Sequence, residues 1–431
     1  MTSARERLAA ALARIDDPAG EGARACLTVY RAQAQAEAEA ADARARHGIS
    51  LGPLDGAIVS LKDLFDVAGE VTRAGSKVLA EEGKRASADA PVVQRLRAAG
   101  AVIVAKTNMS EFAFTGIGIN PHYGTPGNPA DRARVPGGSS SGAAVAAADG
   151  MCEIAIGSDT GGSCRIPAAI CGVVGYKPSR QRIPTTGVFP LSPSLDSIGS
   201  LAKTVAGCAM ADAVMAGDGP FALEPASLSG LRVGVVQGMP LENLEDTVGK
   251  RFPEGLDRLE KAGARLSNET LPLIDDMVRA LSRSSLLVAE VYAIHRERLV
   301  RRGADIDPIV RARVEKGRDI PAADYIELVQ TRAWLIRAMD ARLAELDVLV
   351  MPTTATVAPR VDEVADPKSF MARNAMLLRN PTIANFFDLC AISLPLPRAG
   401  GLPTGLMLIA RNGHDRRLFQ IAAAAERVLG A

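Results

Sequence analysis

The chain has 431 residues, 47% of them apolar, and its 50 Lys and Arg residues almost balance its 49 Asp and Glu residues. A net charge of +1 without a run of basic residues argues against electrostatic binding to nucleic acid or to anionic membranes. We therefore expect a small-molecule substrate. The N-terminal segment carries a short apolar run from Leu8 to Ala13, too short for a signal sequence or a membrane span, which predicts a cytoplasmic protein.

The six cysteines form no C-x-x-C pair, and the four histidines are scattered without the spacing of metal ligands. We expect the thiols to be reduced and the protein to need neither a metal nor another cofactor. A chain of this length can form two or three domains, but large α/β enzymes often fold as one body, and one body is what we expect.

Helices are predicted at the start of the chain. Ser3 and Glu6 form a capping box ahead of apolar residues at helical spacing. Residues 22–46 are Ala-rich with Gln, Glu and Arg between the alanines, which favours one longer helix ended by Gly48. We interpret residues 1–50 as a helical arm that packs on the core or on a partner subunit, and a homodimer is left open.

From about residue 54, short β-branched runs alternate with helical segments. Residues 275–345 are mostly helical. This alternation is typical of an α/β fold in which elements distant in sequence share one sheet. Strands are predicted at 57–63, 101–107, 153–157, 231–237, 348–352 and 404–410, and helices at 91–99, 143–148, 204–215 and 415–429.

Two Gly/Ser-rich turns are the most unusual segments. The first, VPGGSSSG at 135–142, precedes a helix of small residues, and the second, DTGGSCR at 159–165, follows a buried strand. Glycines allow successive backbone N–H groups to converge on one point, as an oxyanion hole requires. Either turn alone is typical of an ordinary loop. Two of them, with Ser163 following Ser139 by 24 residues, favour a catalytic role.

Lys62 is the third candidate. It ends the apolar run from Ala57 to Leu61, where an ammonium group would be desolvated. A lone Lys at a strand end is usually a solvated surface residue. A serine nucleophile needs a base, however, and no histidine is marked out by its sequence context. To act as that base near neutral pH, Lys62 must have a pKa lowered from about 10.4 to roughly 7.

Together with SLKD at 60–63, these turns resemble the amidase signature family of Ser-cisSer-Lys amide hydrolases. Further matching segments are KTNMSEFA at 106–113, GYKPS at 175–179, SLDSIG at 194–199, VMPTTATVAP at 350–359 and GLPTGLMLIA at 401–410. The resemblance covers residues 51–431. It implies a single domain with a large mixed β-sheet covered by helices on both faces, and it places residues 275–345 near the substrate entrance.

The resemblance also implies roles for individual residues. Ser163 would be the acyl-enzyme nucleophile, Ser139 the bridging serine after a cis Gly138–Ser139 peptide bond, and Lys62 the base. Ser140 would hydrogen-bond within this cluster, and Asp159 and Arg165 would brace the second turn. The oxyanion hole would be formed by the backbone N–H groups of Thr160, Gly161, Gly162 and Ser163. Ser141, Cys164 and Ser200 depart from the usual family pattern, but none belongs to the triad.

The sequence leaves the substrate open among aliphatic, aryl and urea-like amides. By family analogy, Met109, Phe112 and Tyr123 are candidates for the pocket wall, although a core position is at least as consistent with their character. Aromatic residues of the helical segment, among them Tyr325 and Trp334, are candidates for shaping the entrance.

We predict a stand-alone amidase that hydrolyses the C–N bond of a small carboxamide through a Ser163 acyl-enzyme. One alternative is the glutamine-hydrolysing subunit of a tRNA-dependent amidotransferase, which the triad does not exclude. Another is a serine esterase, because residues 138–142 satisfy G-x-S-x-G, with Ser140 as nucleophile and His295 or His414 as base. A nucleotide-binding module is disfavoured because neither glycine turn matches a phosphate-binding motif.

Overall fold

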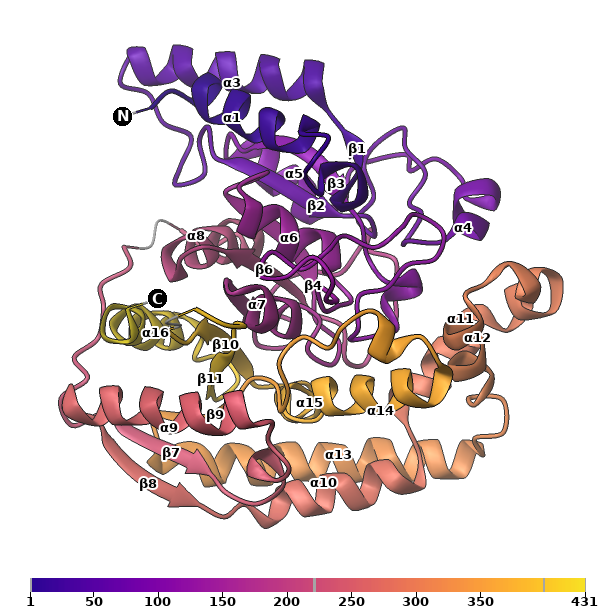
Figure 1. Cartoon of the computed structure of the whole chain (residues 1–431), viewed down its shortest axis with the longest axis vertical. Coiled ribbons are helices and arrows are strands. Elements are labelled where there is room, and N and C mark those ends of the chain that lie inside the picture. The colour runs from indigo at the N-terminus through magenta and orange to yellow at the C-terminus, as the bar shows by residue number, and fades with distance from the viewer. Residues whose placement is uncertain (1, 220–221, 398–399, 431) are drawn as a thin grey trace.

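The computed structural model describes residues 2–219, 222–397 and 400–430. Within these ranges, one mixed sheet of 11 strands runs through the molecule in the order β1-β3-β2-β4-β6-β5-β10-β11-β9-β7-β8 (Figure 1). Its strands are β1 Cys26–Val29, β2 Ile58–Lys62, β3 Val102–Thr107, β4 Ile154–Ser158, β5 Val174–Lys177, β6 Ile198–Ala202, β7 Arg232–Val236, β8 Arg265–Glu269, β9 Val348–Pro352, β10 Cys390–Pro395 and β11 Gly405–Ala410.

Helices cover both faces of this sheet, as predicted for the α/β class (Figure 1). They are α1 Ala4–Asp16, α2 Gly22–Ala25, α3 Arg31–Arg46, α4 Lys77–Glu82, α5 Pro91–Ala98, α6 Ser141–Asp149, α7 Arg165–Cys171, α8 Val205–Ala216, α9 Asp246–Lys261, α10 Pro272–Arg283, α11 Leu286–Arg302, α12 Pro308–Glu315, α13 Ala322–Arg342, α14 Pro367–Leu378, α15 Pro381–Phe386 and α16 Asp415–Leu429.

Alternate residues of β2 face opposite layers of helices, because successive side chains of a strand point to opposite sides. Ile58 packs with small residues of α1, α3 and α6, whereas Val59 and Leu61 pack with α5 and α8. The same division continues in the C-terminal half of the sheet, where α10, α13 and α15 cover one face and α9 and α16 the other. Burial on both faces explains why these strands read as continuous apolar runs.

Strand β2 lies between β3 and β4 and runs parallel to both. Parallel neighbours end at the same edge of a sheet, so the last residue of β2, Lys62, and the last residue of β4, Ser158, lie at one edge. The turn that follows β4 carries Ser163. The strand order therefore brings the lysine and the second glycine turn together although about a hundred residues separate them in sequence.

The prediction of one helix over residues 22–46 is wrong. The chain instead forms the short α2, then β1, then α3. Strand β1 contains Thr28 and Val29, which favour extended backbone, and pairs antiparallel with the outer edge of β3. Pairing with that edge outweighs the helix preference of the flanking alanines, and it makes residues 26–29 part of the same sheet as the rest of the chain.

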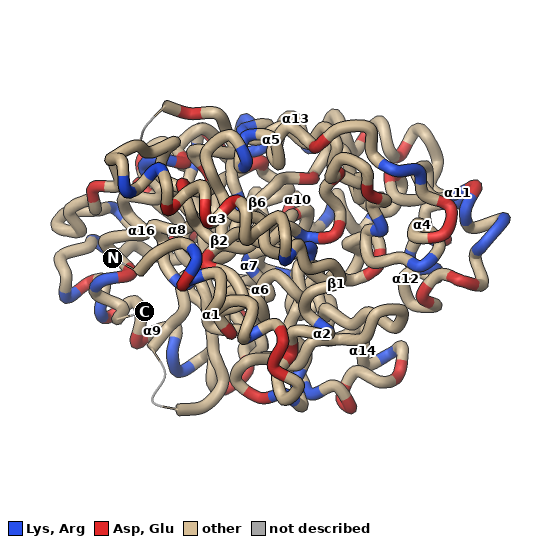
Figure 2. The backbone as a smooth tube through the Cα atoms, turned by 90° about the horizontal axis from the view of Figure 1, so that it is seen from above, with Lys and Arg blue, Asp and Glu red and all other residues tan. Residues whose placement is uncertain are grey.

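Positive and negative residues are interspersed along the backbone (Figure 2), in keeping with a net charge of +1. In the part of the chain that the structure describes, no helix is both long and apolar enough to cross a membrane.

Candidate active site

Lys62 lies at the centre of a buried cluster of hydroxyl groups. Its side chain is 0% exposed, and Nζ donates hydrogen bonds to Ser139 Oγ at 2.7 Å and to Ser158 Oγ at 2.9 Å. Sequence reasoning had assigned no role to Ser158, although it lies only five positions before Ser163. The lysine is thus held by one hydroxyl from the first glycine turn and one from the strand that leads into the second.

The first turn places Ser139 and Ser140 just before α6, and the expected cis peptide bond is present between Gly138 and Ser139. Ser140 links the two turns, because its backbone N–H donates to the Ser163 carbonyl at 3.3 Å and its hydroxyl donates to the Ser158 carbonyl at 3.3 Å. Ser163 is 4% exposed, and its hydroxyl bonds to no described residue, Ser139 included. The relay from Lys62 therefore has its first hydrogen bond in place, and Ser163 is free to approach a ligand.

Burial lowers the pKa of Lys62 to about 7, although the negative charges of Asp159 and Asp196 act in the opposite direction. Removing water from an ammonium group disfavours its charged form. A large fraction of Lys62 is therefore the neutral amine at neutral pH, the form that can accept a proton.

The second turn exposes backbone donors next to Ser163. The N–H groups of Thr160, Gly161 and Ser163 donate to no described residue, so they are available to an oxyanion. Gly162 is a correction to the predicted set, because its N–H already donates to Asp159 Oδ1 at 2.8 Å. Gly162 instead supplies a φ of +129° that residues with side chains rarely adopt.

Asp159 and Arg165 form a fully buried ion pair with 2.9 Å between Oδ1 and Nη2. Asp159 also accepts from the backbone of Gly162 and Cys164, and although burial opposes ionisation, Arg165 holds the pKa of Asp159 well below its usual range. Asn385 of α15 completes this network by donating to Asp159 and accepting from Arg165. Asp159 and Arg165 thus lie in one buried network, and nothing in the local sequence of Asn385 indicates that it belongs to this network.

Asp196 holds the turn from the other side. Its carboxylate accepts from Thr160 Oγ1 at 2.6 Å and from the backbone of Leu191 and Ser192. Burial raises the pKa of Asp196 to about 6. Ser192 in turn donates to Glu290 of α11, so the helical segment is connected to the glycine turn through hydrogen bonds.

A pocket of about 180 Å³ adjoins Ser158 and Thr160, and its wall includes Ala113 and Phe189. The three predicted wall residues do not line it. Met109 is buried in the core, and Tyr123 stacks under Arg73 with 6.0 Å from its ring centroid to the guanidinium carbon. Phe112 packs 6.1 Å from Phe189, measured between ring centroids, and so lies behind the wall.

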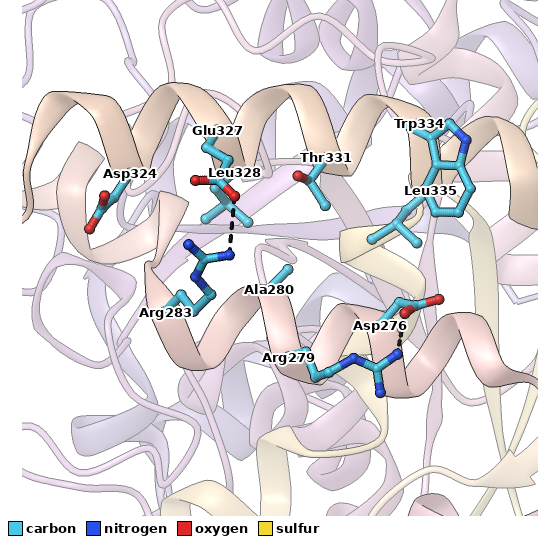
Figure 3. A pocket seen from close by; sticks show the side chains of 10 residues that line it. All are labelled: Asp276, Arg279, Ala280, Arg283, Asp324, Glu327, Leu328, Thr331, Trp334 and Leu335. Atoms are coloured by element: carbon cyan, nitrogen blue, oxygen red, sulfur yellow. Dashed lines mark hydrogen bonds and ion pairs between the residues drawn. The ribbon is translucent and has the colours of Figure 1, made fainter.

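Trp334 lies elsewhere. It lines a groove of about 310 Å³ between α10 and α13, where it lies beside Leu335 at the end near Asp276, and the ion pair between Arg283 and Glu327 lies towards the other end (Figure 3). None of the residues lining this groove lines the pocket at Ser158, so Trp334 does not shape that entrance. Tyr325, in contrast, bonds to Glu290 at 2.9 Å and belongs to the network that reaches Thr160.

The alternative based on G-x-S-x-G finds no support in this geometry. Ser140 is 0% exposed, and its hydroxyl is directed to a backbone carbonyl. His414 is exposed at the start of α16, and burial lowers the pKa of His295 to about 3. In the described ranges, no group of three or more His, Cys, Asp or Glu side chains could hold a metal ion.

Comparison with known proteins agrees with this arrangement. The model of the Amidase family matches residues 6–419. The chain belongs to the amidase family. A 2-amino-5-chloromuconic acid deaminase from Comamonas testosteroni is 35% identical over 99% of this chain and 94% of its own length. A Glutamyl-tRNA(Gln) amidotransferase subunit from Symbiobacterium thermophilum is 34% identical over 94% of this chain and 89% of its own length.

Solved structures of this amidase family have the same fold. One, described as a crystal structure of an amidase, has a TM-score of 0.88 and 31% identity and covers 100% of this chain and 97% of that one. Another, from an inhibitor-bound protein complex described as revealing the evolutionary origins of an s-triazine catabolic enzyme, has a TM-score of 0.88 and 32% identity and covers 100% of this chain and 96% of that one. The chain is therefore a hydrolase of C–N bonds in amides other than peptides.

Proposed function

We propose that this protein is a stand-alone amidase that cleaves a small carboxamide through a Ser163 acyl-enzyme and releases ammonia or an amine. The observation that carries the proposal is the fully buried Lys62, whose Nζ lies 2.7 Å from Ser139 Oγ. A buried neutral amine beside a hydroxyl is a base with a proton relay attached.

In the first step, Ser163 Oγ attacks the amide carbon while its proton passes to Ser139, and the Ser139 proton passes to Lys62. The oxygen of the tetrahedral intermediate accepts hydrogen bonds from the free N–H groups of Thr160, Gly161 and Ser163; each such donor contributes about 10²- to 10³-fold to the rate. The relay then returns the proton to the leaving nitrogen. Water hydrolyses the acyl-enzyme by the same route.

The glutamine-hydrolysing amidotransferase component is the second candidate, because relatives of that kind are about as similar to this chain as the deaminase is. A solved chain of similar structure also comes from a protein complex. We favour the stand-alone enzyme because the fold matches the solved amidase, with a TM-score of 0.88, better than a solved Glutamyl-tRNA(Gln) amidotransferase subunit, with a TM-score of 0.74. The deaminase relative acts on an acid, so small carboxylate-bearing molecules belong among the substrates to be screened.

The purified chain should be assayed alone on aliphatic amides, aryl amides, urea-like amides and glutamine. We expect turnover in one of the first three classes. A fluorophosphonate adduct mapped by mass spectrometry should lie on Ser163 and be lost in Ser163→Ala. An adduct on Ser140 would contradict the assigned nucleophile, and activity confined to glutamine in the presence of the other amidotransferase components would contradict the stand-alone enzyme.

A further inference from the structure

The pocket at Ser158 has a mainly apolar wall. No Lys, Arg or His is among the described residues that line it, and its one carboxylate is that of Asp196. The pocket therefore offers contact to an apolar group and no cation that could pair with an anion. The apolar side chains of the wall include Leu64, Val188, Phe189, Pro190, Leu191 and Ile198.

The polar groups of this wall are already bonded within the chain. Ser158 Oγ accepts a hydrogen bond from Lys62, and Ser197 Oγ donates to a backbone carbonyl at 2.7 Å. The Asp196 carboxylate accepts from Thr160 Oγ1 and from backbone N–H groups. A carboxylate with donors of its own does not call for a cationic ligand. Apolar contact is therefore what this pocket has left to offer a substrate.

The wall is held in place from behind. The Phe189 N–H donates to the Leu64 carbonyl at 2.8 Å. The ring of Phe189 packs against the rings of Phe112 and His295, with centroid distances of 6.1 Å and 5.7 Å. Because the wall is already ordered, little conformational entropy is lost when a ligand enters.

The pocket has the size of an aromatic ring and adjoins the catalytic groups. An engineered cavity of about 150 Å³ in another protein, lined by Leu, Ile and Phe, binds benzene. This pocket measures about 180 Å³. One of its lining residues, Thr160, has a free backbone N–H, and another, Ser158, is bonded to Lys62. A ring in the pocket would thus lie next to the turn that carries Ser163.

We propose that this pocket takes an apolar ring of the substrate, whose amide lies at Ser163. The inference rests on the proposed function and selects aryl amides from the classes that the sequence leaves open. It disfavours glutamine, which carries an ammonium and a carboxylate group. Burial of either charge against this wall without a partner would weaken binding, and the same holds for other carboxylate-bearing amides.

The first test compares kcat/KM for benzamide and for acetamide, which lacks the ring. The wild type should prefer benzamide. Val188→Phe fills the pocket and should lower the benzamide-to-acetamide ratio by about 10- to 100-fold, the factor expected for burial of one aromatic ring. Val188→Thr keeps the shape of the wall but adds a hydroxyl, and it should lower the ratio by roughly 5-fold. The matched control is Val300→Phe, at a position on α11 that is 86% exposed, which should leave the ratio unchanged.

A second comparison tests the charge of the substrate. Succinamate and 4-methylpentanamide have nearly the same shape, but succinamate ends in a carboxylate. The wild type should have a kcat/KM at least about 10-fold higher for 4-methylpentanamide, because the pocket has no cation to pair with that carboxylate. A preference for succinamate would overturn the proposal.

Binding separates this inference from the proposed function. Saturation-transfer NMR can follow benzamide on Ser163→Ala, with and without Val188→Phe, and requires no turnover. If the wild type hydrolyses no amide but benzamide binds in a way that depends on Val188, the stand-alone amidase is wrong and the apolar pocket stands. If the wild type does not prefer benzamide to acetamide, or if Val188→Phe changes neither the ratio nor the binding, the pocket is not the site of a substrate ring.

Discussion

Thr160 donates a hydrogen bond from Oγ1 to the Asp196 carboxylate at 2.6 Å. The same threonine offers one of the free backbone N–H groups of the second glycine turn. A buried carboxylate thus fixes the turn in place and also contributes a negative charge that raises the pKa of Lys62. Positioning and electrostatics can be separated by substitution, because one depends on the hydrogen bond and the other on the charge.

In a plot of kcat/KM against pH, Asp196→Asn should move the acidic limb to lower pH by roughly half a unit to one unit. Loss of the negative charge favours the neutral form of Lys62, which then persists to more acidic pH. Thr160→Val removes the hydrogen bond but leaves the carboxylate in place, so it should lower the rate and move the limb less than Asp196→Asn does. Asp340→Asn, which removes a carboxylate paired with Arg411, is the control. A limb that moves to higher pH would contradict the electrostatic role.

The wild type should gain activity as pH rises through about 7, since burial lowers the pKa of Lys62 to about 7 and only the neutral amine accepts a proton. Lys62→Ala and Ser139→Ala should each lower kcat by about 10²- to 10⁴-fold. The double variant should be scarcely worse, because the two residues act as one relay. Additive losses, or a kcat/KM that is flat between pH 6 and 9, would count against the relay.

Arg165→Met should lower the free energy of unfolding by about 3–5 kcal/mol, because Asp159 would remain as a buried, unpaired charge. Both side chains of this pair are 0% exposed. The control is Arg232→Met, which breaks an ion pair with a half-exposed arginine and should cost less than about 1 kcal/mol. Urea denaturation of both variants measures the difference. Similar losses of unfolding free energy in the two variants would mean that burial does not determine how much an ion pair contributes to stability.

Gly162→Ala should reduce activity by about 10²-fold or more, since a displaced turn loses its oxyanion donors. An added Cβ would lie 2.6 Å from Pro381 Cβ and 2.8 Å from Ile166 Cδ1. Gly48→Ala is the matched control, because Gly48 also has a positive φ but has nothing within 4 Å of an added Cβ. Kinetic assays should therefore show near-normal activity for Gly48→Ala. Equal losses of activity in both variants would indicate that backbone strain, rather than the clash of the added Cβ with Pro381 and Ile166, causes the effect.

The triad candidates were predictable because each is marked by its local sequence. Ser139 and Ser163 lie in glycine turns, and Lys62 interrupts an apolar run. Asn385 was not predictable, since it reaches Asp159 across 226 residues of sequence and only the sheet order brings them together. Strand β1 was not predicted because helix propensity depends on the local sequence. The strand forms through a tertiary contact, its pairing with β3.

The pocket at Ser158 is lined by other residues than Met109, Phe112 and Tyr123, and for Phe112 the reason is conformational. Phe112 and Ala113 have φ values of +52° and +60°, a left-handed conformation that residues with side chains rarely adopt. This turn places Ala113 at the pocket and sends Phe112 towards His295, with 4.0 Å between the ring centroids. A regular backbone, which is what a sequence pattern assumes, would not have separated the two side chains in this way.

The edge strand β1 has a practical consequence for handling the protein. Its antiparallel pairing covers the hydrogen-bonding edge of β3, and α1 and α3 cover apolar side chains of the same sheet. Trimming the first thirty residues would remove β1 and α1 but leave α3, so it would open the edge of β3 and uncover the apolar side chains under α1. An open, apolar strand edge is a template for self-association. An affinity tag can be attached ahead of Ser3, whereas a shortened N-terminus should yield aggregates rather than a smaller enzyme.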